Sequence, residues 1–191
     1  MAQHTYAQAI DQTIVELEAM KLTITNELAK LDEATLSKRP QPNKWNALEC
    51  VEHLVQFNLV YMGNMEVALE GKTPPKTSDT WRSGWLGNMM YKRMLPREDG
   101  TIPSPIKTFK SLEPRNAPES VSMAGLATLT AQIENLKTQI EDSRELNLEK
   151  IKVNSAIGPI LKFRLGDVFL IVTAHLARHL LQAKRAAGLI A

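Results

Sequence analysis

The chain has 191 residues, of which 43% are hydrophobic and 23% are charged, so its composition is that of a globular protein. This length is sufficient to bury a core without disulfides, and we expect one domain over residues 1–191. The 23 basic and 21 acidic side chains give a net charge of +2, which excludes a strongly basic protein and gives no reason to expect a nucleic-acid or membrane partner. The longest apolar stretch, residues 168–181, contains two histidines and an arginine and is too short to span a bilayer.

The cysteine content and the first residues bear on the cellular compartment. Cys50 is the single cysteine, so no internal disulfide can form, and we expect a reducing, cytoplasmic location. The first residues carry no basic segment followed by an apolar run, so we expect no signal peptide.

Four segments have the apolar periodicity of long helices. Apolar residues recur at three- and four-residue spacing over residues 5–31, 47–69, 122–145 and 165–187. Asn46 and Glu49 form a capping-box pattern at the start of the second helix, and Ser122 is a plausible cap for the third. The fourth helix is apolar nearly all round, which is typical of a central, buried helix.

The segment between the second and third helices differs in composition, because seven of the ten prolines fall between residues 74 and 118. Trp81, Trp85 and Met89 are four residues apart and predict a short helix near residues 80–94, whose apolar stripe packs on the bundle or on a second subunit, or covers the functional site. After Pro96 we expect surface chain, and the best strand candidate is residues 151–157. The predicted fold class is all-α, a four-helix bundle with a long, partly helical connection between helices two and three.

The histidines carry the chemistry. The chain has four, and His175 and His179 are four residues apart on the fourth helix, so they share one face at about 6 Å along the axis. Two imidazoles at this spacing can bind one metal ion, as in zinc enzymes. The alternative to metal binding is that each histidine is a core residue hydrogen-bonded to a neighbour. This is less favoured for two histidines in an apolar helix, because their four ring nitrogens would need partners where few polar groups are present. His53, near the start of the second helix, is the candidate third ligand, and His4 is treated as incidental.

Other candidate ligands are few. A dinuclear carboxylate bundle needs Glu-x-x-His on two helices, and the fourth helix has no glutamate near either histidine, so we expect a mononuclear site. Cys50 shares a face with His53 and is a possible ligand, although a buried core residue is the favoured interpretation.

Two sequence elements resemble the DinB-like (DinB/YfiT) family of four-helix metalloproteins. The first covers residues 45–54, with Trp45, the helix cap and His53 followed by leucine. The second is Gly158-Pro159, then Leu165-Gly166-Asp167, leading to a closing His-x-x-Arg-His-x-x-Gln motif over residues 175–182. The resemblance implies a four-helix bundle in which His53, His175 and His179 hold one divalent transition metal, with zinc or nickel the commonest ions. Members of this family include thiol-dependent transferases that use low-molecular-weight thiols such as bacillithiol, and a mycothiol-dependent isomerase. Homodimers are common among them. The resemblance therefore implies a small-molecule substrate, such as a low-molecular-weight thiol, and a homodimer for this chain.

Three neutral imidazoles leave the charge of the ion uncompensated and at least one coordination position open, which is typical of catalytic rather than structural zinc. We therefore expect a metal-dependent thiol transferase or hydrolase that activates a thiol or water toward a small electrophile. The alternative is a non-enzymatic, stress-related binding protein with a structural or sensing metal. Gln182 and Glu49 are candidates for orienting the ligand histidines, and Arg178 is a candidate for anion recognition or, as we favour, for a structural role.

Overall fold

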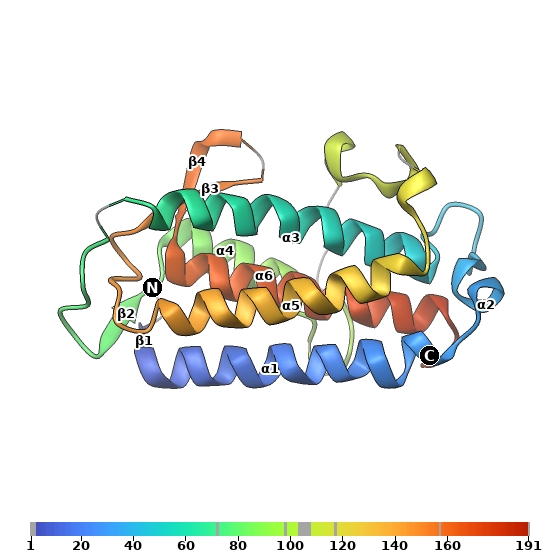
Figure 1. The fold of residues 1–191 in the computed structure, drawn as a ribbon, viewed down its shortest axis with the longest axis horizontal. Helices are drawn as coiled ribbons and strands as arrows, with labels where there is room; N and C mark the ends of the chain where they lie inside the picture. Colours follow the sequence, from blue (N-terminus) through green and yellow to red (C-terminus); the bar gives the residue numbers. More distant parts are fainter. Residues whose placement is uncertain are drawn as a thin grey trace.

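Helices make up most of the structure, a computed structural model that describes residues 3–71, 73–97, 99–102, 108–116, 118–156 and 158–190 (Figure 1). The helices are α1 (Tyr6–Asn26), α2 (Glu33–Ser37), α3 (Ala47–Leu69), α4 (Trp85–Met94), α5 (Ala124–Asp142) and α6 (Leu165–Ala186). The strands are β1 (Gln3–Thr5), β2 (Thr80–Arg82), β3 (Lys152–Ser155) and β4 (Gly158–Arg164). Among the described residues, none of the helices has both the length and the apolarity that crossing a membrane requires.

The four long helices α1, α3, α5 and α6 lie side by side (Figure 1). Helix α6 packs against α1, α3 and α4, and it is buried over most of its circumference, as its apolar sequence predicts. Helices α1 and α5 bury the periodic stripes predicted for them, which include Leu17, Ile24, Leu129, Ile133 and Leu136. Burial of these side chains at about 1.5–3 kcal/mol each supplies the main driving force that holds the helices together.

The predicted ends of two helices need correction. The first helix ends at Asn26 rather than at residue 31, because a 3₁₀ turn at Leu28–Lys30 buries Leu28, and Asp32 then caps α2 by accepting a hydrogen bond from the Thr35 amide. Helix α5 begins at Ala124, and Ser122 is not its N-cap. The Ser122 carbonyl, rather than its side chain, accepts a hydrogen bond from a backbone amide of the first turn.

The prediction of an all-α chain missed two small antiparallel sheets. Strands β1 and β2 pair with His4 opposite Trp81, and β3 and β4 form a hairpin with Val153 opposite Phe163. Strand β3 falls inside the segment 151–157, although Ile157 itself lies outside the described residues. Strand β1 has only three residues and pairs with β2, which lies far along the chain. Such a short strand shows no alternation of apolar and polar residues by which it could be predicted.

The connection between α3 and α5 is partly helical, as predicted, but it does not behave as one apolar stripe. Trp81 is buried in β2 and stacks on His4 at 4.7 Å between ring centroids, whereas Trp85 at the start of α4 is 71% exposed. After α4, 3₁₀ turns at Lys110–Leu112 and Pro114–Asn116 pack against α3. The described residues of the connection after Pro96 are mostly exposed, as the sequence predicts, but Leu112 and Pro114 in these turns are buried.

Candidate metal centre

Three histidines from two helices converge. The two on α6 are one turn apart, and the capping box of Asn46 and Glu49 fixes the start of α3 two turns before His53. One ring nitrogen of each of the three residues lies within 4.8 Å of the others. His53 Nε2 is 3.2 Å from His175 Nε2, and the ring centroid of His179 is 4.6 Å from that of His53. All three rings are buried.

A different contact orients each ring. His53 Nδ1 donates to the Leu112 carbonyl at 2.8 Å, and His179 Nδ1 donates to Gln182 Oε1 at 3.1 Å. His175 stacks on Phe57, with centroids 3.7 Å apart and planes at 20°, and its buried Nδ1 has no hydrogen-bond partner in the part of the chain that the structure describes. Because carbonyl and amide oxygens only accept, a neutral His53 and a neutral His179 carry their protons on Nδ1 and keep lone pairs on Nε2.

The electrostatics favour neutral imidazoles. Burial, together with the neighbouring His179, His53 and Arg178, holds the pKa of His175 well below its ordinary value. Burial likewise lowers the pKa of His179 and, less strongly, that of His53. Convergent nitrogens on neutral, buried imidazoles can hold a cation between them, and neutral imidazole is the form that binds a metal. The donor set therefore fits one divalent transition ion.

A pocket of about 750 Å³ opens onto the three histidines. Its apolar wall includes Phe57, Met94, Phe109 and Leu112. Its described charged side chains are Lys44, Glu113, Arg115 and Arg178. The size is that of a small-molecule site, and the pocket gives the ion-binding nitrogens access to a ligand.

Two expected supporting residues lie in the pocket wall. Gln182 contacts His179, as described above, and Arg178 is buried with Nη1 donating to the Arg93 carbonyl near the end of α4 at 3.2 Å. Burial, followed by the charge of Arg93, lowers the pKa of Arg178. Arg178 thus joins α4 to α6 beside the ligands, which fits the structural role favoured for it.

Glu49 does not orient His53, and this expectation is corrected. Its carboxylate accepts from the Asn46 amide at 2.9 Å and forms an ion pair with Arg39. The capping geometry turns Glu49 back toward the helix start, so its position four residues before His53 is not used. Cys50 is fully buried outside the three-histidine group, and burial raises the pKa of its thiol, so it is a core residue.

Sequence reasoning missed Leu112 and Glu113, which line the pocket from the connection. Leu112 acts through its backbone carbonyl, which every residue has, so no side-chain signal exists for it. Glu113 accepts from Trp45 Nε1 at 2.9 Å, and Trp45 in turn packs against His53 and His179. Burial raises the pKa of Glu113, but hydrogen bonds from Arg115 and Trp45 outweigh it and leave that pKa below its ordinary value.

The histidine environment predicts a pH dependence for the stability of the metal-free protein. The folded-state pKa values of His53, His175 and His179 are lowered, so below about pH 6.5 the unfolded chain binds more protons than the folded one. The free energy of unfolding should therefore fall as the pH drops from 7 to 5, as measured by urea unfolding in the presence of a chelator. His175→Ala removes a buried ring whose pKa is held well below its ordinary value and should flatten the decline, and an equally steep decline in that variant would contradict the assignment.

Gln182→Ala tests the orientation of His179. Loss of the acceptor for Nδ1 should weaken zinc binding by about 10–100-fold, the usual effect of removing a partner of a ligand histidine. Gln182→Glu keeps an acceptor at this position and should bind at least as tightly as the wild type. Competition with a chromophoric chelator measures both affinities, and equal affinities for Gln182→Ala and wild type would show that the contact is not used.

Comparison with known proteins bears on the whole chain. The family model described as the DinB superfamily matches residues 16–183, a span that contains all three histidines and all four long helices except the first turns of α1 and the last residues of α6. No curated protein and no solved structure matches the chain. Since the matched span covers well over half of its length, the chain belongs to the DinB superfamily.

Proposed function

We propose that this protein is a metal-dependent enzyme in which His53, His175 and His179 hold one divalent transition ion, zinc or nickel, at the bottom of a small-molecule pocket. The observation that carries the proposal is that one ring nitrogen from each of three buried histidines converges at a pocket of about 750 Å³ that these histidines line. The superfamily is metal-binding, which supports the assignment. The four long helices, which lie side by side, fit the four-helix bundle implied by the resemblance.

The reaction class follows from the ligand count and the pocket wall. An ion with three neutral ligands and an open position supplies Lewis acidity, which lowers the pKa of a thiol or water bound to it and makes a nucleophile at neutral pH. Glu113 is the single carboxylate among the described residues of the pocket, and its lowered pKa and two hydrogen-bond donors make it a poor general base. A thiol needs less help from a base than water does, so we favour a thiol S-transferase over a hydrolase.

The chain's own residues have separable tasks in such a reaction. Leu112, Phe57 and Gln182 hold the three imidazoles in place, and the apolar wall excludes water from one side of a bound substrate. Arg178 fixes the end of α4 against α6 at the pocket edge. The homodimer, the low-molecular-weight thiol and the cytoplasmic location stay predictions.

The test is thiol binding to cobalt-substituted protein. Cobalt(II) in the site should show a sulfur-to-metal charge-transfer band when 2-mercaptoethanol is added, and none when ethanol is added. Cobalt binding without a thiol band would contradict a thiol transferase and favour the non-enzymatic alternative, with a structural or sensing metal. His4→Ala, at a residue outside the three-histidine group and the pocket, serves as a folded control that should retain the band.

A further inference from the structure

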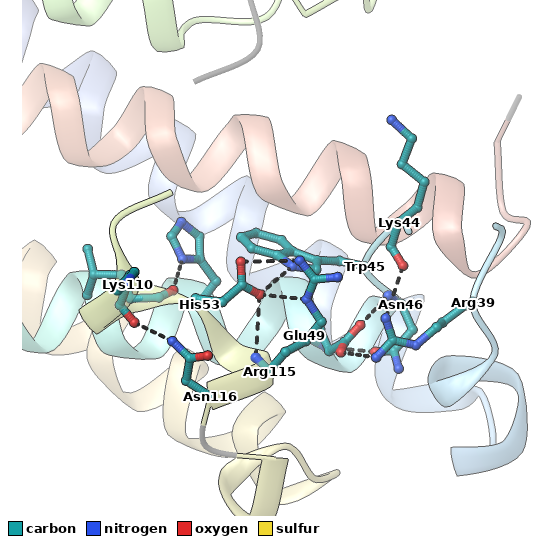
Figure 2. A network of polar contacts seen from close by, with 11 residues as sticks. Arg39, Lys44, Trp45, Asn46, Glu49, His53, Lys110, Arg115 and Asn116 are labelled. Carbon is teal, nitrogen blue, oxygen red and sulfur yellow. Dashed lines mark hydrogen bonds and ion pairs between the residues drawn. The ribbon is translucent and has the colours of Figure 1, made fainter. Parts of the chain in front are cut away.

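A short segment between α4 and α5 contacts the metal ligands from outside the helices. The Leu112 carbonyl accepts from His53, and the neighbouring Glu113 carboxylate accepts from the Trp45 indole, so adjacent residues make two contacts with the start of α3. Leu112 is also buried. Figure 2 shows His53 and Trp45 side by side, with Arg115 and Asn116 beyond them.

The same segment is braced internally. Arg115 Nε donates to Glu113 Oε1 at 2.9 Å, and Asn116 Nδ2 donates to the Lys110 carbonyl at 2.7 Å. Glu113 therefore accepts hydrogen bonds from Trp45, just before α3, and from Arg115 in its own segment. The carboxylate links the braced segment to the start of α3.

Trp45 lies between Glu113 and two of the histidines and contacts both. Its indole lies 4.9 Å from the His53 ring and 5.8 Å from the His179 ring, measured between centroids. Rotation of the indole would remove packing from two of the three imidazoles. Glu113 holds the indole nitrogen at 2.9 Å and so restricts that rotation, although it does not itself belong to the group of convergent nitrogens.

We propose that Glu113 is a positioning residue of the metal centre, and that metal binding is linked to docking of residues 110–116 on α3. The inference rests on the metal site proposed above. If the docked segment holds His53 and Trp45 in the geometry that binds the ion, then docking strengthens ion binding. Since linkage is reciprocal, ion binding must favour docking of the segment by the same free energy. The segment is thus part of the metal centre rather than a passive connection.

The two halves of the linkage are measured separately. Zinc affinity is measured by chelator competition in Glu113→Ala, which loses the hydrogen bonds from Trp45 and Arg115, and in Glu113→Gln, which keeps an acceptor for Trp45. We expect affinity to fall about 10–100-fold in Glu113→Ala and by a smaller factor in Glu113→Gln. Glu119→Ala, an exposed acidic position in the same connection, is the matched control and should bind as the wild type does. Wild-type affinity in Glu113→Ala would overturn the proposal.

The reciprocal half uses limited trypsin digestion, because Lys110 and Arg115 are exposed on the segment. Zinc should slow cleavage after these residues in wild type, and the protection should be weaker in Glu113→Ala. Equal cleavage with and without zinc, in a wild-type protein that binds zinc, would overturn the linkage while leaving the metal site in place. A wild-type protein that binds no zinc would overturn the metal site and the proposed function together.

Discussion

Replacement of His175 by alanine is expected to remove stoichiometric metal binding. His175 is buried and lies against both other imidazoles of the three-histidine group, with centroids 5.0 Å from His53 and 4.5 Å from His179. Zinc sites with four protein ligands contribute roughly 10–16 kcal/mol, so one ligand accounts for about 3–4 kcal/mol, or roughly 10²–10³-fold in affinity. Metal content should fall from about one equivalent to a small fraction of one.

The measurement is elemental analysis of protein purified without a His-tag or nickel resin. His4→Ala is the matched control, because His4 stacks on Trp81 in the β1–β2 sheet and is not part of the three-histidine group. It should retain the full metal content. A wild-type content below a few tenths of an equivalent that does not change in His175→Ala would remove the basis of the metal site. Circular dichroism of the two variants separates loss of the ion from loss of the fold.

Gly166→Ala is expected to destabilise the fold by about 2 kcal/mol, because an added methyl group overpacks a closed contact. A Cβ at this position would lie 2.7 Å from two atoms of the Trp81 ring, which is 1% exposed. The indole is rigid and is stacked on His4, so the overlap can be relieved only by a shift of the start of α6 away from β2. Urea unfolding of the chelated protein gives the difference in free energy.

Gly63→Ala provides a control of opposite sign. Gly63 lies in the interior of α3 with nothing within 4 Å of an added Cβ, so the substitution meets no obstacle. The better helix propensity of alanine should stabilise the protein by about 0.5–1 kcal/mol. If both glycine variants change the free energy of unfolding in the same direction, overlap with Trp81 is not the reason that position 166 requires glycine.

The helices and the two candidate ligands on α6 were predictable because their determinants are local. The segment 47–69 matches α3 from end to end, since the cap, the capping box and the apolar periodicity all lie within it. Spacing alone placed His175 and His179 on one face. His53 was connected to them through the family resemblance, and the packing of α3 on α6 brings its Nε2 within 3.2 Å of His175.

The long helices, the family and the residues that could bind a metal can be read along the chain, because periodicity, caps and motif spacing depend on neighbouring residues. The groups that hold those residues in place depend on the packing of distant segments: Leu112 and not Glu49 contacts the His53 ring, and Glu113 accepts a hydrogen bond from Trp45. The β1–β2 pairing likewise joins residues far apart in sequence. These features have one cause in common. A backbone carbonyl or a three-residue strand acquires its partner only when distant segments pack together, and no residue type marks it beforehand.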